Sequence, residues 1–197
     1  MRNIRFAAWA AIAVLIAAVG VVFLRGGGGV SKALSPVAQI GGPFELTTHD
    51  GKRLSSAELK GTPFAIFFGF TFCPDVCPTT MLELTNVLKR LGPDADRMRY
   101  FFVSVDTERD NPAHLKLYLS NFDSRIVGLT GTAEEIAAVA KSYRAYYERV
   151  PTKDGFTYNH TAIIYLMGRD GKLASTISYQ EKEDTQLAKL RRVIAQP

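Results

Sequence analysis

The chain has 197 residues, 47% of them apolar, which is enough for one domain with a buried core plus an additional segment and excludes a wholly disordered protein. Its 24 Lys and Arg residues are spread among 19 acidic residues and leave a formal net charge of only +5. Because nucleic-acid binding needs a clustered basic face, we expect no nucleic-acid partner.

An uncharged apolar run occupies residues 6–24. A bilayer-spanning helix needs about 20 apolar residues, whereas the apolar region of a cleavable signal has about 7–15 residues followed by a small-residue cleavage site. The run ends at Phe23-Leu24-Arg25, without such a site, so we predict a transmembrane anchor helix over residues 1–25, with a long secretory signal as the alternative. Arg2 and Arg5 precede the run, and positive charge stays in the cytoplasm. We therefore expect the rest of the chain on the exported (periplasmic) face of a membrane such as the bacterial inner membrane.

Glycines, serines and a proline follow the apolar run. Four consecutive glycines stand at 26–29, and Ser31, Ser35 and Pro36 come after them. This composition is typical of a flexible linker. We predict a tether over residues 26–42 and a globular domain over residues 43–197.

The domain begins with a strand pattern at 44–48 and a hairpin turn at Asp50-Gly51. A nearly continuous apolar run at 64–70 predicts a central strand that is covered on both faces. A helix should follow from Pro78, because proline suits the first helical position, and should end at Gly92-Pro93.

Strand and helix patterns then alternate to the end of the chain. Strands are predicted at 100–105, 126–129, 160–166 and 173–178, and helices at 112–122, 132–147 and 183–194. The alternation predicts a parallel core sheet, to which the last two strands add an antiparallel hairpin. We therefore predict an α/β fold with a thioredoxin-like sheet and an added N-terminal β-hairpin.

The two cysteines of the chain stand together in the sequence Cys73-Pro74-Asp75-Val76-Cys77-Pro78, between the expected central strand and its helix. Each precedes a proline, and the residue before a proline avoids the helical region. We therefore expect Cys77 to be the N-cap of the helix and Cys73 to lie in the preceding turn. A helix N-terminus favours negative charge, which lowers the pKa of a cysteine and makes it a better nucleophile and metal ligand.

Three roles compete for this cysteine pair. A structural disulfide would close a very small loop and stabilise little, because stabilisation grows with loop size. Thiol–disulfide exchange fits an exported compartment and a low-pKa pair at a helix start, although such sites usually have two residues between the cysteines instead of three. A metal site needs a further ligand, because two thiolates leave most metals under-coordinated.

His160 is the candidate for that further ligand. We expect the other two histidines, His49 and His114, to be surface residues in a turn and near a helix start. His160 begins the strand that should run antiparallel beside the cysteine strand, so it should lie at the edge where Cys73 emerges. Asp106 ends a parallel strand and falls on the same edge, where open α/β sheets bind ligands.

Two thiolates and one imidazole form a soft ligand set. Thiolate selects Cu(I), imidazole is accepted by copper and zinc, and structural zinc would need four ligands. With Cys73, Cys77 and His160 as metal ligands, the pattern favours copper, as Cu(I) or, with an added oxygen ligand, as Cu(II). Asp106 and Asp75 are candidates for a fourth ligand, or for neighbouring carboxylates that adjust the charge around the metal.

Three segments of the chain carry a family resemblance. Residues 70–78 resemble the copper-site motif of the Sco/SenC family, in the sequence Phe70-Thr71-Phe72-Cys73-Pro74-Asp75-Val76-Cys77-Pro78. Residues 105–110, Val105-Asp106-Thr107-Glu108-Arg109-Asp110, resemble its second motif, and Asn159-His160-Thr161 resembles its histidine segment. The resemblance extends over about residues 37–195, and the predicted anchor agrees with it.

The resemblance implies a copper metallochaperone for cytochrome c oxidase assembly. Such proteins deliver copper to the dinuclear copper centre of an oxidase subunit on the exported face, and an upstream copper donor is a further partner that we expect. Cys73, Cys77 and His160 match the family's ligand positions. Some members are proposed to reduce the cysteines of that centre instead. The alternative is therefore a membrane-anchored thiol–disulfide oxidoreductase that uses Cys73 and Cys77 as a redox disulfide, and otherwise we expect no enzymatic turnover.

Two positions depart from the family pattern. Thr107 stands where a proline is frequent, and Asn159 stands where an aspartate is frequent. The asparagine removes a carboxylate beside the histidine, which could weaken support for the metal ligand. A peroxidase is disfavoured, because peroxiredoxins have a threonine three residues before the reactive cysteine and Phe70 occupies that place before Cys73.

Overall fold

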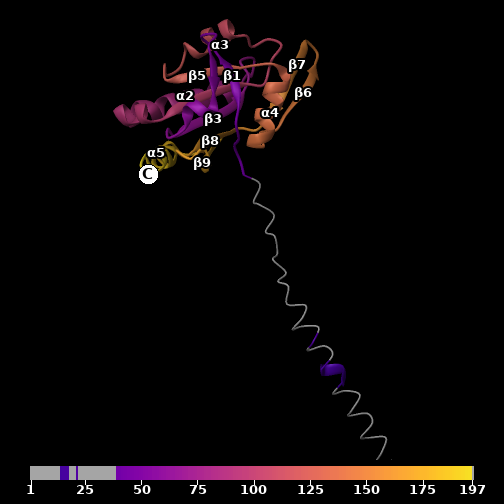
Figure 1. Cartoon of the computed structure of the whole chain (residues 1–197). Helices are drawn as coiled ribbons and strands as arrows, with labels where there is room; N and C mark the ends of the chain where they lie inside the picture. Colours follow the sequence, from indigo (N-terminus) through magenta and orange to yellow (C-terminus); the bar gives the residue numbers. More distant parts are fainter. Residues whose placement is uncertain (1–13, 18–20, 22–38, 197) are drawn as a thin grey trace, which may run out of the picture. The chain divides into compact units, whose positions relative to one another are not determined.

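The computed structural model describes residues 14–17, 21 and 39–196 of the chain (Figure 1). The predicted anchor over 1–25 and the tether over 26–42 lie largely outside these residues and stay predictions. Residues 14–17 are helical, and no helix within the described ranges is both long enough and apolar enough to span a bilayer. The described residues from Gln39 onward form one compact unit.

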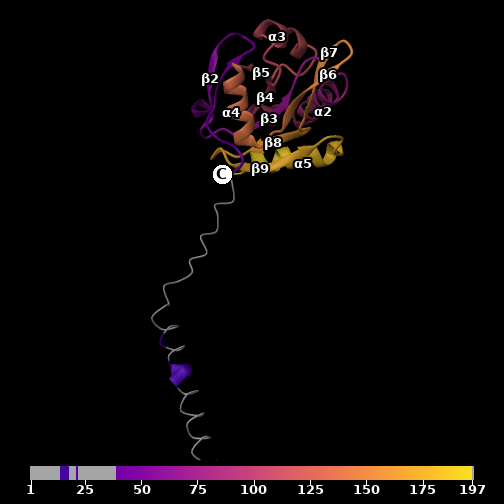
Figure 2. The same cartoon turned by 90° about the vertical axis from the view of Figure 1, so that its right-hand side faces the viewer.

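A seven-stranded mixed sheet lies at the centre of this unit, in the strand order β2-β1-β5-β4-β3-β8-β9 (Figures 1 and 2). β3 pairs in parallel with β4 and antiparallel with β8, while β1 and β2 form the predicted N-terminal hairpin beside β5. The predicted α/β fold with a thioredoxin-like sheet is therefore confirmed for the described unit. The strands are β1 (Glu45–Thr48), β2 (Arg53–Ser55), β3 (Phe64–Gly69), β4 (Arg99–Ser104), β5 (Ile126–Thr130), β8 (Ile163–Met167) and β9 (Leu173–Ser178).

Helices cover both faces of the sheet. Phe67 of β3 points to the face that carries α2, and Phe68 points to the opposite face, where its ring centroid lies 5.6 Å from that of Tyr143 in α4. α5 packs beside α2, as the 3.0 Å ion pair between Arg90 and Glu183 shows. The helices are α2 (Val76–Leu91), α3 (Pro112–Leu119), α4 (Ala133–Tyr143) and α5 (Glu183–Ile194), with short 3-10 helices at Ser56–Leu59 and Gly92–Arg97.

All six residues of β3 are buried. A strand with both faces covered has no solvent side, so its sequence is apolar throughout instead of alternating. This confirms the prediction of a central strand at 64–70. The cysteine loop therefore follows a rigid element at the middle of the sheet.

A second hairpin was not predicted. β6 (Tyr147–Thr152) and β7 (Gly155–His160) form a separate two-stranded sheet. The helix prediction to residue 147 was wrong, because α4 ends at Tyr143 and Arg144 adopts a left-handed conformation with φ 53°. The Asp154-Gly155 pair was an available turn signal, and Gly155 has φ 134°, a value that favours glycine.

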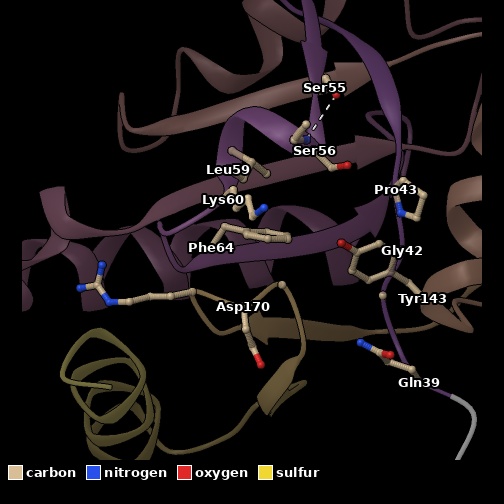
Figure 3. A pocket seen from close by; sticks show the side chains of 14 residues that line it. Gln39, Gly42, Pro43, Ser55, Ser56, Leu59, Lys60, Phe64, Tyr143 and Asp170 are labelled. Atoms are coloured by element: carbon tan, nitrogen blue, oxygen red, sulfur yellow. Dashed lines mark hydrogen bonds between the residues drawn. The ribbon is translucent and has the colours of Figure 1, made fainter. Parts of the chain in front are cut away.

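A cavity of about 560 Å³ lies at the end of the sheet where β3 begins. It is lined by Phe64, Ser56 and Lys60, and the Tyr143 hydroxyl points into it (Figure 3). The cysteine loop follows the other end of β3, so this cavity is separate from the candidate metal ligands.

Candidate metal centre

The structure brings Cys73, Cys77 and His160 together. Their ligand atoms all lie within 4.8 Å of one another, and Cys77 Sγ is 3.3 Å from His160 Nε2. Cys77 is fully buried, whereas Cys73 and His160 are half-buried. This arrangement of two sulfur atoms and one imidazole nitrogen could hold a metal ion that remains reachable from the surface.

The cysteine loop connects β3 to α2. Cys73 lies in this loop, but Cys77 is the second residue of α2, and Asp75 is the N-cap. The prediction that Cys77 caps the helix was therefore wrong. A proline in the first helical turn is tolerated because backbone N–H groups there have no partner within the helix, so Pro78 does not exclude Cys77 from the helix. The Cys77 N–H donates instead to Cys73 Sγ at 3.4 Å.

His160 reaches the site by a route that was not predicted. It is the last residue of β7, and β8 begins only at Ile163. His160 therefore does not itself begin the strand beside β3. The antiparallel pairing of β8 with β3 nevertheless returns the chain to the end of β3 where the cysteine loop emerges. The expected position of His160 near Cys73 was right, although it belongs to a different strand.

The His160 ring has a defined orientation. Its Nδ1 lies 3.2 Å from the Thr161 carbonyl oxygen, and a carbonyl only accepts hydrogen bonds, so Nδ1 carries the proton. In the neutral ring, the lone pair available to a metal is then on Nε2, which faces Cys77 Sγ. The edges of Phe67 and Phe70 pack against the ring, with centroids 5.9 and 5.7 Å away. The imidazole is therefore oriented for metal binding through Nε2.

The two thiols differ in acidity. The hydrogen bond from the Cys77 thiol lowers the pKa of Cys73, with further lowering by His160 and by the N–H groups of Cys77 and Asp75, and burial opposes this shift. Burial raises the pKa of Cys77, and the neighbouring Cys73 raises it further. The pair therefore holds one thiolate, at Cys73, and one proton, at Cys77.

We expect Cys73 to react with iodoacetamide well before Cys77 in the reduced protein. An ordinary cysteine has a pKa of about 8.5, and its thiolate fraction falls about tenfold for each pH unit below that value. Because the pKa of Cys73 is lowered, its alkylation rate should change little between pH 8 and pH 6. Peptide mass spectrometry at timed intervals measures both rates. Equal rates for the two cysteines, or a steep fall with pH at Cys73, would contradict the assignment of the thiolate.

Gly69 makes room for the Cys77 sulfur. A Cβ atom at this position would lie 2.7 Å from Cys77 Sγ and 2.9 Å from the Phe67 ring, closer than real contacts allow. Any side chain at 69 would displace the sulfur or the ring. Gly69 interrupts the aromatic run Phe67-Phe68-Gly69-Phe70. A glycine within a strand often marks a close approach of another group, and this signal was not used in the prediction of the site.

Asp110 holds the start of the cysteine loop. It is buried, and its carboxylate accepts hydrogen bonds from the Thr71 N–H at 2.9 Å, the Thr71 hydroxyl at 2.6 Å and the Ser104 hydroxyl at 2.5 Å. Asp110 is the last residue of the motif at 105–110, but no role was predicted for it from the sequence. The carboxylate connects the end of β4 to the loop that carries Cys73.

The two other predicted carboxylates lie beside the site and not within it. Among the described residues, the group of side chains that could hold a metal ion contains neither Asp106 nor Asp75. Asp106 is fully buried and paired with Arg109, and Asp75 is exposed. Their influence on the charge of the site remains a prediction. Asn159 is exposed as well, so its side chain faces solvent.

The other two histidines have structural contacts. His49 was expected to be a solvated turn residue, but its side chain is only 16% exposed, and its Nδ1 accepts a hydrogen bond from the Gly128 N–H at 2.9 Å. That expectation was wrong, because His49 joins the first hairpin to β5. His114 is half-buried and stacks on Phe72, with ring centroids 5.2 Å apart. Neither belongs to the candidate metal group.

Comparison with known proteins identifies similar chains. The family model SCO1/SenC matches residues 32–195. The human mitochondrial protein SCO1 homolog is 41% identical over 140 residues, which cover 68% of this chain and 46% of the human protein. The SCO2-like protein of Rickettsia felis is 36% identical over 137 residues, covering 68% of this chain and 67% of that one. The chain spans about half the length of the first curated relatives it matches.

Solved structures agree with these relatives. The structure of Bradyrhizobium japonicum ScoI with copper bound is 51% identical, with a TM-score of 0.74, and the match covers 78% of this chain and 99% of that one. Yeast Sco1 with copper bound is 32% identical, with a TM-score of 0.74, and covers 81% and 90% of the two chains.

Proposed function

The chain belongs to the SCO1/SenC family, and we propose that it binds copper through Cys73, Cys77 and His160 and delivers it to the dinuclear copper centre of cytochrome c oxidase. The observation that carries the proposal is the convergence of two sulfur atoms and an oriented imidazole nitrogen within 4.8 Å. The copper-bound structures of ScoI and Sco1 support it.

The donor set fits copper by its chemistry. Thiolates are soft ligands that select Cu(I), and imidazole binds both copper oxidation states. Structural zinc sites have four protein ligands, and the group described here has three. Three ligands suit Cu(I), and an added oxygen ligand would accommodate Cu(II). When copper binds, Cys77 must release its proton, since only the thiolate coordinates.

Transfer requires a site that a partner can reach. Cys73 is half-buried in a loop, and the neighbouring Phe72 is 50% exposed. A thiolate of the partner can therefore approach the metal beside Cys73 and replace its ligands one at a time, while the half-buried His160 and the buried Cys77 hold the ion. We place this domain on the exported face of a membrane such as the bacterial inner membrane, with its N-terminus cytoplasmic, anchored by residues 1–25 and supplied by an upstream copper donor.

A copper titration of the reduced full-length chain tests the proposal. We expect one Cu(I) per chain under anaerobic conditions, and a thiolate-to-copper charge-transfer band when Cu(II) is added. Protein oxidised to the Cys73–Cys77 disulfide is the matched control and should bind neither ion at this site, because the sulfur atoms are then no longer thiolates. Reduced protein that bound no copper would refute copper delivery.

A second function is favoured by the unequal acidity of the two cysteines. Thiol–disulfide exchange needs one thiolate to attack and a neighbouring thiol to resolve the mixed disulfide. Cys73 would attack a partner disulfide and release one partner thiolate, and Cys77, after losing its proton, would then attack Cys73 and release the other. The partner gains two electrons and this chain forms the Cys73–Cys77 disulfide. The lowered pKa of Cys73 beside the protonated Cys77 supports this alternative.

A further inference from the structure

The β6–β7 hairpin carries His160 but makes few hydrogen bonds to the rest of the protein. Its two strands form a sheet of their own, separate from the central sheet. Within residues 39–196, and apart from bonds to the adjoining residues Tyr146 and Thr161, two hydrogen bonds join residues 147–160 to the chain outside the hairpin. One is the Cys77–His160 contact of the candidate site, and the other runs from Arg109 Nη1 to the Phe156 carbonyl oxygen at 3.2 Å. The position of the hairpin therefore depends mainly on side-chain contacts.

Arg109 contacts all three segments that meet at the site. Its Nε donates to Asp106 in the loop after β4. Its Cζ lies 4.5 Å from the centre of the Phe72 ring, directly before Cys73, and 3.9 Å from the centre of the Phe156 ring, four residues before His160. These distances are those of cation–π contacts. One guanidinium thus connects the cysteine loop to the strand that ends in the histidine.

The guanidinium is held by these contacts in a defined place. Asp106 is fully buried, and the Arg109 side chain is 26% exposed. The Arg109 Nη2 atom is buried and has no hydrogen-bond partner among the described residues, so the aromatic faces beside it provide its stabilisation. A planar, forked donor is needed to donate to Asp106 and Phe156 while contacting two rings, which the ammonium group of lysine cannot do.

We propose that Arg109 is a positioning residue for the metal centre, which sets the distance of His160 from Cys73 and Cys77 by holding β7 against the cysteine loop. This inference rests on the proposed copper site, but its structural part concerns the metal-free protein as well. Without Arg109, the hairpin would keep its own strand pairing and the contact of Tyr158 with Phe70, whose ring centroids lie 5.4 Å apart. His160 would therefore remain nearby but with a less defined position.

Arg149 offers a matched control. Its Cζ lies 3.8 Å from the centre of the same Phe156 ring, and its Nε is 3.6 Å from Glu108. Among the contacts of the described residues, none joins Arg149 to Phe72, so Arg149 contacts the hairpin without joining it to the cysteine loop. Arg109→Gln and Arg149→Gln therefore each remove one positive charge and one contact with the Phe156 ring. Only Arg109→Gln also removes the link between the hairpin and the cysteine loop.

The test compares Arg109→Gln, Arg109→Lys and Arg149→Gln in the full-length chain. We expect Arg109→Gln to lower the copper affinity at least about tenfold, the effect typical of residues that support a metal ligand, and to shift the thiolate-to-Cu(II) band. Arg109→Lys should behave similarly, because the lysine ammonium keeps the positive charge but lacks the planar, forked donors of the guanidinium. Arg149→Gln should change the affinity by less than about fivefold and leave the band in place, as is typical of exposed ion pairs.

A measurement without copper separates this inference from the proposed function. In the metal-free protein, Arg109→Gln should speed hydrogen–deuterium exchange at residues 155–160, and Arg149→Gln should not. If the wild type bound no copper, the proposed function would fail while this exchange result still decided the role of Arg109. Unchanged exchange together with an unchanged affinity and band in Arg109→Gln would overturn the inference.

A second variant covers the case in which Arg109→Gln does not fold. Phe156→Leu leaves the Asp106–Arg109 pair intact and removes the ring on β7 that Arg109 contacts, together with the contacts of that ring with Arg149 and Tyr158. The same band shift and faster exchange at 155–160 are expected, to a smaller extent because the hydrogen bond to the backbone carbonyl remains. Wild-type behaviour of this variant on all three measurements would overturn the inference.

Discussion

Replacing His160 with alanine is expected to lower the copper affinity of the reduced protein more than about 100-fold, because even residues that only support a metal ligand cost about 10–100-fold when removed. The imidazole is one of three donors in the candidate group, and its Nε2 faces Cys77 Sγ at 3.3 Å. No other histidine among the described residues belongs to that group. Competition with a Cu(I) chelator of known affinity measures the loss.

Thiol–disulfide exchange should respond differently to the same substitution. The largest contribution that lowers the pKa of Cys73 is the hydrogen bond from Cys77, and the His160 contribution is smaller. Removing the imidazole therefore leaves most of the shift. A modest rise of the pKa reduces the thiolate fraction but raises its nucleophilicity, so the rate should fall by less than about tenfold. The rate is measured by reduction of a small aromatic disulfide.

Two comparison variants make the result decisive. Cys77→Ser should abolish tight copper binding and the second step of exchange together, since both use this sulfur. His114→Ala removes a histidine that stacks on Phe72 and is outside the candidate metal group, and it should leave the copper affinity close to that of the wild type. Wild-type copper affinity in His160→Ala would exclude His160 as a ligand. A collapse of exchange in this variant would instead indicate that the imidazole serves the thiols.

Replacing Asp110 with alanine is expected to lower the free energy of unfolding by about 2–4 kcal/mol, the cost of leaving several buried donors without their charged acceptor. The carboxylate is 1% exposed and accepts hydrogen bonds from the Thr71 N–H, the Thr71 hydroxyl and the Ser104 hydroxyl. Urea denaturation followed by near-ultraviolet circular dichroism of the buried tyrosines measures the change.

The same substitution should loosen the cysteine loop. Thr71 lies two residues before Cys73, so loss of its anchor exposes the loop, and Cys77 should become more accessible to alkylation. Asp110→Asn is the informative comparison, because an amide oxygen can still accept from Thr71 and Ser104, and it should lose less than half as much stability. Asp75→Ala, at an exposed carboxylate, should have little effect. A fully stable Asp110→Ala would show that the carboxylate does not hold the loop.

Most of the fold was predictable because its elements have local signals. The apolar run at 64–70 became β3, and the helix predicted over 183–194 is α5 with the same bounds. In α4, Thr132 and Glu135 form the capping box that the sequence indicated. These signals reside in the periodicity and the capping chemistry of short segments, so they do not depend on distant parts of the chain.

The β6–β7 hairpin escaped prediction because its residues are half exposed and contain no long apolar run. Its strand residues are buried only in part, and Pro151 lies within β6. Exposed two-stranded ribbons are stabilised by packing of a few aromatic side chains against the domain, here Tyr158 on Phe70. The sequence does not reveal such packing until the position of Phe70 is known.

By itself, the sequence determined the cysteine motif, its place after the central strand, and the choice of His160 over the other histidines, because strand order places these residues at one end of the sheet. Only the tertiary structure decided how the residues act together: which thiol keeps the proton, which imidazole nitrogen faces the sulfur atoms, and how Asp110 and Arg109 hold the segments in place. These properties arise from burial and from contacts between residues far apart in the chain, such as Cys77 and His160, which are 83 positions apart, and no local pattern encodes them.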